Sequence, residues 1–230
     1  MRLQFPARPL RWLVPVLILL GLAGVSLWMF ASRWRPSPTD YPVQGIDVSE
    51  DQGPIEWWSA KDAGVQFAYL RATSGAEGRD AAFAENWRGA GQAGVRRGAL
   101  HVYSLCQPAA AQAGNFISTV PRPDDQLPPA VELDFSGDCP ARPDRAALIG
   151  ELGHFLAAIE THIGKPAILL VSPGFESDYR VAEPFPRLLW ARQSFIAPWY
   201  FARPWTIWQA SRLRRIDGVG TPVHWDVMAK

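Results

Sequence analysis

Carboxylic acids interrupt three otherwise apolar stretches of this 230-residue chain, and each stretch has the composition of a β-strand. Glu132 and Asp134 are separated by a single leucine within the stretch 130–135. In a strand, residues i and i+2 point to the same face about 7 Å apart, so these two carboxyl groups share one face. Crowding raises the pKa of at least one carboxyl group, as a general acid near neutral pH requires. The pair therefore predicts a site for acid–base chemistry.

Eight strand-like stretches supply the scaffold for these acids. Each of the four gaps between the first five stretches carries a helix-like pattern, which is clearest over 143–163 and is also seen over 80–94 and 108–120. Pro143 and Asp144 suit the first turn of that last helix, and Gly164 suits its end. Alternation of strands and helices predicts an α/β fold with a parallel sheet. The eight expected strands are 43–48, 67–72, 99–104, 130–135, 167–171, 188–191, 205–209 and 223–227.

The spacing of the strands favours a small closed TIM-like barrel over an open sheet. About 24 residues per strand is fewer than the ~30 of a complete strand–helix–strand unit, so the last connections must be abbreviated. We expect a (β/α)5(β)3 barrel; the alternative is an open doubly wound sheet, although no nucleotide-binding glycine motif is present. Strands one and eight are neighbours in a closed barrel. Asp47 and Asp226 would therefore join Glu132 and Asp134 at the mouth, where such barrels keep their active sites.

Aromatic residues indicate the class of substrate. Sugar rings present C–H surfaces that stack on aromatic rings, so an acidic cleft rich in tryptophan suits a polysaccharide. Trp190 and Trp208 lie in late strands and are the best candidates for the cleft; the alternative is core packing, the usual role of tryptophan. His101 either orients a carboxylate at the site or is a hydrogen-bonded histidine of the barrel.

The N-terminal region differs in composition from the rest of the chain. Residues 12–32 carry no charged side chain and would form a helix about 31 Å long, which matches a bilayer core. We predict a cytoplasmic N-terminus over 1–11, a transmembrane signal anchor over 12–32, a linker over 33–42 and a catalytic domain over 43–230. This topology puts the domain on the periplasmic side of the inner membrane. The alternative is a cleaved signal peptide.

The overall charge of +1 conceals two different populations of residues. Five of the 23 basic residues precede Asp40, a segment without acids, which leaves 18 basic against 22 acidic residues elsewhere. This balance excludes a strongly basic nucleic-acid binder. An oxidising compartment favours a disulfide between Cys106 and Cys139; the alternative is two unrelated buried thiols. Neither cysteine has a Cys or His at ligand spacing, so no metal site is expected.

An ordered set of motifs resembles glycoside hydrolase family 25, the lysozymes of the Chalaropsis type, across residues 44–228. The resemblance implies the (β/α)5(β)3 barrel and hydrolysis of the β-1,4 bond after N-acetylmuramic acid in peptidoglycan, without a cofactor. It also implies retention of configuration with help from the substrate's N-acetyl group. On this basis we expect Tyr69, Arg71, His101, Trp190, Trp208 and Gln209 to bind substrate. The matching motifs are 45–49 with Gln52-Gly53, 67–73, Phe83 with Asn86-Trp87, 98–101, 127–134, 189–191 and Trp208-Gln209.

The chain also departs from the pattern of the family it resembles. The family usually has Asp-x-Glu on its fourth strand, whereas this chain has Glu132-Leu133-Asp134. By position, Asp134 would be the general acid/base, and Glu132 would polarise the acetamido group or stabilise the transition state; alternatively, the two roles are exchanged. Ser74 stands where the family often has Glu. Two other functions therefore stay open: a non-catalytic peptidoglycan-binding module, and a hydrolase of another N-acetylated glycan such as chitin.

Overall fold

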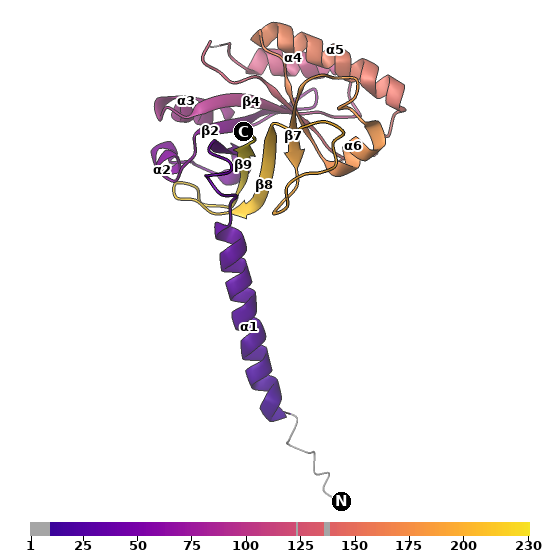
Figure 1. Cartoon of the computed structure of the whole chain (residues 1–230). Helices are drawn as coiled ribbons and strands as arrows, with labels where there is room; N and C mark the ends of the chain where they lie inside the picture. Colours follow the sequence, from indigo (N-terminus) through magenta and orange to yellow (C-terminus); the bar gives the residue numbers. More distant parts are fainter. Residues whose placement is uncertain (1–9, 123, 136–138) are drawn as a thin grey trace, which may run out of the picture.

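A closed barrel of eight strands forms the body of the computed structural model, which describes residues 10–122, 124–135 and 139–230 (Figure 1). Neighbouring strands are parallel from β1 through to β8, and β9 closes the barrel between β8 and β1. The short β3 (Gly78–Arg79) extends β2 outside the barrel. The barrel strands are β1 (Gln44–Val48), β2 (Phe67–Ser74), β4 (Arg96–Val102), β5 (Ala130–Leu133), β6 (Ile168–Val171), β7 (Leu188–Arg192), β8 (Ile207–Arg214) and β9 (Val223–Met228).

A helix follows each of the first five barrel strands. The helix predicted over 143–163 is α5, and the side chain of Asp144 caps it by accepting a hydrogen bond from the Ala147 N–H. Gly164 ends α5 with a left-handed φ of 76°, a conformation that glycine adopts without strain. The five helices are α2 (Trp57–Asp62), α3 (Phe83–Gln92), α4 (Ala109–Thr119), α5 (Arg145–Ile163) and α6 (Pro173–Tyr179), and a short 3-10 turn, η1 (Glu50–Gln52), precedes α2.

The closed barrel predicted from the strand spacing is confirmed, but one strand runs against the expected direction. β9 is antiparallel to both β8 and β1. Residues 215–222 alone connect β8 to β9. A parallel crossover needs about a dozen residues or more, so this short connection can only form a hairpin.

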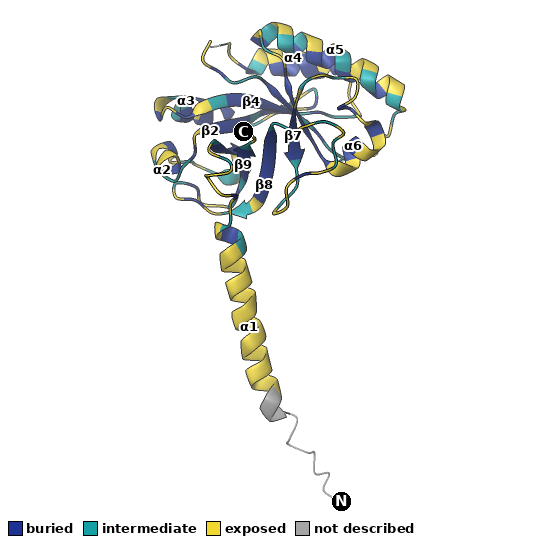
Figure 2. Cartoon of the chain, viewed as in Figure 1, coloured by how far each residue is buried: buried dark blue, intermediate teal, exposed yellow. Residues whose placement is uncertain are grey.

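Strand alternation separates the apolar side chains into two layers. One layer fills the barrel, and the other lies between the barrel and its helices, so the strands are buried on both faces (Figure 2). Successive strand residues point to opposite faces, so parity decides which layer a residue joins. The inner layer comprises Phe67, Tyr69, Leu100, Ala130, Ile168, Leu170, Trp190 and Ile207.

Helix α1 (Leu10–Arg33) projects from the barrel and is exposed along most of its length (Figures 1 and 2). By length and composition it is apolar enough to cross a membrane, a test that a signal sequence also passes. Its last turn is joined to the end of β8, where the Arg215 N–H donates to the Ser32 carbonyl over 2.8 Å.

The segment after α1 packs on the outside of the barrel. Trp34 lies edge-on to Trp208 with ring centroids 6.3 Å apart, and Tyr41 stacks on Trp205 at 6.2 Å. The chain therefore runs along the outer face of β8 from the mouth of the barrel to its base, where β1 begins. Helix α1 accordingly leaves the domain at the mouth end.

Candidate active site

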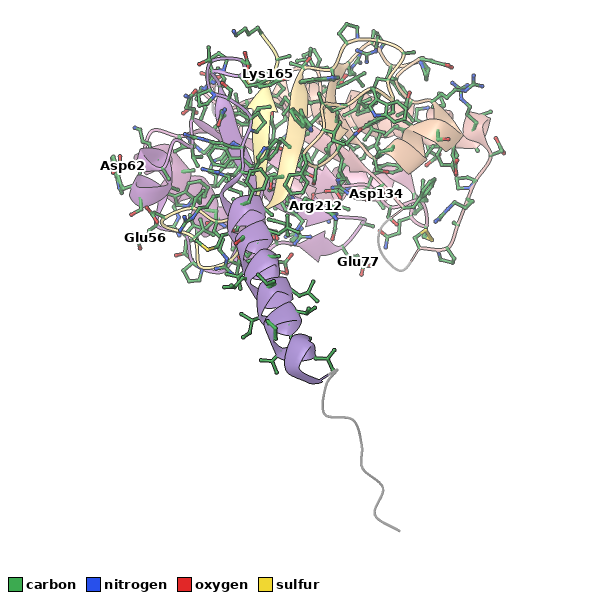
Figure 3. The ribbon with its side chains drawn as sticks, turned by 60° about the horizontal axis from the view of Figure 1, so that its bottom comes forward. Glu56, Asp62, Glu77, Asp134, Lys165 and Arg212 are labelled. Atoms are coloured by element: carbon green, nitrogen blue, oxygen red, sulfur yellow. A yellow bond between two sulfur atoms is a disulfide. The ribbon has the colours of Figure 1, made fainter. Side chains whose placement is uncertain are left out.

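The carboxyl ends of the parallel strands surround a cavity of about 300 Å³. It contains Glu132 and Asp134 from the end of β5 together with Asp47 from β1. Figure 3 shows Asp134 and Arg212 on the side of the barrel from which α1 projects, whereas Lys165 lies at the opposite end. The remaining lining residues are Val48, Ser49, Asp51, Gln52, Arg71, Leu100, Arg192, Arg212 and His224.

Arg192 joins Glu132 of β5 to Asp134, which directly follows β5 (Figure 3 labels Asp134). Its Nη2 lies 2.6 Å from Glu132 Oε1, and its Nη1 lies 2.5 Å from Asp134 Oδ2. The three side chains are only 14 to 22% exposed, so water screens these ion pairs weakly. Burial alone would lower the pKa of Arg192, but the two carboxylates raise it, and the guanidinium stays charged. The trio is anionic with both acids ionised and neutral when the pair holds one proton.

Packing fixes the position of Arg192 at the end of β7. Its backbone N–H donates to the hydroxyl of Tyr200 over 2.7 Å, and that hydroxyl donates to the Val171 carbonyl over 2.6 Å. Tyr200 thereby ties β7 to β6, and the guanidinium is aimed across the mouth at β5. A side chain held in this way is preorganised for charge recognition.

Asp47 forms a second charged group in the same cavity. Its Oδ1 lies 2.7 Å from Nδ1 of His224, and its Oδ2 accepts a hydrogen bond of 2.7 Å from Nε2 of Gln209. Burial would raise the pKa of Asp47, but His224 and Gln209 lower it below its usual value. The same contact raises the pKa of His224 against the effect of its burial. The pair therefore favours a carboxylate on Asp47 and an imidazolium on His224.

Asp226 lies deeper in the barrel and has the opposite character. It is fully buried, and its Oδ1 accepts a hydrogen bond of 3.1 Å from Nε1 of Trp190. Burial, together with the nearby charge of Asp47, raises the pKa of Asp226 well above its usual value. The environment therefore favours the neutral form of Asp226 and the charged form of Asp47, although the two acids are close in space.

Three residues expected to contact substrate are instead enclosed by the protein. Trp190 is fully buried in the barrel interior, where its ring lies 4.9 Å from that of Tyr69, itself fully buried. Trp208 is 3% exposed and points outward onto Trp34. In this structure the barrel wall or the segment after α1 covers the rings of Trp190, Trp208 and Tyr69, as in the alternative of core packing.

His101 also lies away from the mouth. It points outward from β4, where its Nδ1 lies 2.7 Å from Thr73 Oγ1 and its Nε2 lies 3.2 Å from Gln112 Oε1. Its ring packs 4.7 Å from that of Phe155 on α5, and burial lowers its pKa to about 4. These contacts fit the alternative of a hydrogen-bonded histidine between barrel and helices, and the lowered pKa favours its neutral form.

Arg71 and a neighbouring hollow extend the site. Arg71 lines the cavity and pairs with Asp51 over 2.5 Å and with Asp80 over 3.4 Å. A second hollow of about 430 Å³ adjoins the cavity, and Asp134 lines both of them. Cys106 and Cys139 border this hollow, and the predicted disulfide between them is confirmed, with an S–S distance of 2.05 Å. A depression that continues on both sides of Asp134 suits a polymer rather than a small molecule.

Two residues of the site were missed in the sequence. Arg192 follows Trp190 by two positions, and His224 precedes Asp226 by two, so each shares a strand face with a residue that was singled out. Strand parity was the available signal. Parity gives the face on which a residue lies but not the height of that residue along the barrel axis. Arg192 and His224 lie at the height of the mouth, whereas Trp190 and Asp226 lie below it.

Comparisons with known proteins agree with this architecture. The family model described as Glycosyl hydrolases family 25 matches residues 46–219. The chain is 30% identical over 201 residues to the uncharacterized protein YegX of Escherichia coli K12, covering 83% of this chain and 71% of that protein. It is 30% identical to lysozyme M1 of Streptomyces globisporus, covering 79% and 66%. A family 25 glycosyl hydrolase from Bacillus anthracis superposes with a TM-score of 0.76 at 28% identity, covering 86% of this chain and 92% of that chain.

Proposed function

The chain belongs to glycosyl hydrolase family 25, and from this membership we propose that it is an N-acetylmuramidase that acts on peptidoglycan. The reaction is hydrolysis of the β-1,4 bond between N-acetylmuramic acid and N-acetylglucosamine. The observation that carries the proposal is the pair Glu132 and Asp134, which face one cavity at the barrel mouth and are held by Arg192. The named lysozyme among the relatives supports the same substrate class.

Asp134 is the proposed general acid/base. In its acid form it donates a proton to the glycosidic oxygen while the bond from that oxygen to C1 of N-acetylmuramic acid breaks. The acetamido oxygen of the same sugar bonds to C1 from the opposite face and forms a cyclic oxazolinium. Water then attacks C1, Asp134 removes the water proton, and the ring reopens. Two inversions at C1 leave its configuration retained.

Glu132 and Arg192 support this reaction in two different ways. Glu132 accepts a hydrogen bond from the acetamido N–H, so it stabilises the positive charge that develops on the oxazolinium. Arg192 touches both acids and is a positioning residue, because it fixes the distance between the proton donor and the group that polarises the acetamide. When the pair holds one proton, the trio is neutral, which is the state that begins the reaction.

Asp47 supplies a fixed negative charge in the same cavity. His224 and Gln209 lower the pKa of Asp47, so its carboxylate faces the developing oxocarbenium-like charge at any pH near neutrality. The raised pKa of Asp226, which lies deeper in the barrel, favours its neutral form, so Asp47 is the acid that carries the charge. This division of roles uses Asp47 for electrostatic stabilisation and Asp226 for support of the barrel interior.

We also propose that α1 is an uncleaved single-pass anchor of the inner membrane and that the barrel is extracytoplasmic. The apolar span, from Leu13 to Arg33, and the bias of arginines toward the N-terminus support this topology. The Cys106–Cys139 disulfide supports an oxidising compartment. Retention of residues 1–32 in protein extracted from membranes tests the anchor against the cleaved signal peptide.

Digestion of purified sacculi tests the enzymatic proposal. Wild-type protein should release muropeptides with reducing N-acetylmuramic acid ends, identified by mass spectrometry. Asp134→Asn should lower the rate about 100- to 10,000-fold, the usual contribution of a general acid, with only a small change in melting temperature because Glu132 still pairs with Arg192. Asp62→Asn is the matched control, because Asp62 is an exposed acid on α2 outside the cavity (Figure 3). Undiminished release by Asp134→Asn would refute the assignment.

A second candidate function is a binding module that holds peptidoglycan without cleaving it. The observation that favours it is the double ion pair, because an acid held as a carboxylate by Arg192 has no proton to donate. Wild-type protein that sediments with sacculi but releases no muropeptide would support this reading. Product release from chitin oligomers but not from sacculi would instead support a hydrolase of another N-acetylated glycan.

A further inference from the structure

Large apolar side chains are exposed in the connection between β7 and β8. Phe195 is 39% exposed, Ile196 64% and Trp199 79%. Outside α1, the large exposed apolar residues of the described chain are these three and the isolated Trp58, Ile117 and Leu188. Three such side chains within five positions form a patch of the kind that marks an interaction surface. We call residues 195–199 the apolar loop.

The apolar loop lies beside the point where α1 meets the barrel. The ring of Phe195 is 5.2 Å from that of Trp34, which directly follows the last residue of α1. In Figure 1 the connection between β7 and β8 descends to the height at which α1 leaves the domain. The loop therefore continues the apolar surface of α1 rather than forming a separate patch elsewhere.

The backbone holds the apolar loop in this position. Phe195 has a left-handed φ of 69°, which is unusual for a residue with a side chain, and its N–H donates to the Ala210 carbonyl over 2.8 Å. Nε1 of Trp208 donates to the Gln193 carbonyl just before the loop. These bonds to β8 fix a strained conformation that directs apolar side chains into solvent, so their exposure is built into the fold.

Basic residues surround the same junction. Arg33, Arg35, Arg212 and Arg215 are exposed, and residues 193–206 contain no acid. Arg214 donates to the carbonyl of Arg33, which places the end of β8 against the end of α1. Exposed aromatic and aliphatic side chains with neighbouring arginines match the interface of a bilayer that carries anionic headgroups.

We propose that the apolar loop is a second membrane contact, inserted into the interface of the bilayer that α1 crosses; this rests on the proposed anchor. Two contacts prevent the barrel from swinging about the end of α1. The mouth with Asp134 opens on the side of α1 (Figure 3), so the domain would be held with its cleft toward the bilayer. Its substrate would then be glycan lying close to the membrane surface.

A fluorescent probe of the loop tests this contact in the full-length chain. Both native cysteines are in the disulfide, so a cysteine introduced by Ile196→Cys or Trp199→Cys is the single free thiol for an NBD label. The protein is reconstituted into vesicles of phosphatidylcholine and phosphatidylglycerol, with and without doxyl-labelled lipid. Ile117→Cys is the matched control, because Ile117 is an exposed isoleucine on α4, remote from α1 (Figure 1).

The expected result is a shift of NBD emission to shorter wavelength and quenching by doxyl lipid at 196 and 199, several-fold stronger than at 117. Flotation of the vesicles reports the anchor separately. Protein that floats with the vesicles while all three labels stay equally water-exposed would overturn the membrane contact and leave the anchor intact. A wavelength shift without quenching by lipid would indicate that the label packs against protein rather than lipid, and would overturn it too. Protein that fails to float overturns both proposals.

Discussion

Removal of the Cys106–Cys139 disulfide should lower the free energy of unfolding of the barrel by an amount that follows from the length of the loop that the disulfide closes. The bridge closes a loop of 33 residues that contains β5 with Glu132. Loop-closure entropy for that length gives about 3.7 kcal/mol of stabilisation at 25 °C. For a domain of about 190 residues this corresponds to a fall in melting temperature of about 7 to 15 °C.

Thermal unfolding of four proteins, each with and without a thiol reductant, measures this effect. The single variants Cys106→Ala and Cys139→Ala should melt together with the double variant, because one remaining cysteine closes no loop. Reductant should lower the melting temperature of the wild type to the same value. The double variant is the control for non-specific effects of the reductant and should not respond to it.

The disulfide also borders the hollow beside Asp134, so its loss should affect the cleft. Reduced wild type should release muropeptides more slowly even well below its melting temperature, because a wall of the hollow is no longer tied to the barrel. A melting temperature that reductant leaves unchanged would refute the loop-entropy argument. Equal rates for oxidised and reduced protein would refute the link to the cleft.

Three further predictions concern ionisable groups at the mouth and directly below it. His224→Asn should lower the free energy of unfolding most between about pH 4 and pH 6.5. The raised pKa of His224 stabilises the fold below its ordinary value of 6.5, and the lowered pKa of Asp47 stabilises the fold above 3.8. Denaturant titrations at several pH values should therefore show a smaller loss outside that window. Asp226→Asn should unfold at neutral pH no more easily than wild type, because the raised pKa of Asp226 makes its ionisation unfavourable to the fold as pH rises above 3.8. Asp226→Ala leaves Trp190 Nε1 without its acceptor and should unfold more easily in the same assay. Arg192→Gln should lower the free energy of unfolding by about 3 kcal/mol, because two largely buried carboxylates lose their cation; a loss under about 0.5 kcal/mol would contradict the geometry of the trio.

Much of the barrel could be predicted from the sequence because the signals are local. Asp144 caps the start of α5 and Gly164 caps its end, and each cap depends on only a few neighbouring residues. The alternation around Glu132 and Asp134 fixes their common face through the geometry of a single strand. The direction of β9 could also have been deduced, since the length of the connection before it leaves no room for a crossover.

The composition of the candidate site was only partly predictable, because local signals do not say which residues of different strands meet. Trp190 and Trp208 look equivalent in the sequence, each lying in an apolar late strand, yet one fills the barrel and the other packs beneath Trp34. The sequence does not distinguish these two positions, because strand parity groups residues on a face but does not identify which face is inside. Parity also does not show at which position along a strand the packed core of the barrel ends and the mouth begins.

By itself, the sequence determined the family, the strand acids and the existence of one apolar helix. Only the tertiary structure decided that Arg192 from β7 pairs with both Glu132 in β5 and Asp134 just after it, and that His224 from the last strand holds Asp47 from the first. These partners are 58 to 177 positions apart in the chain. Closure of the barrel and the stagger of its strands set the contacts between them, and neither is encoded in the neighbourhood of any one residue.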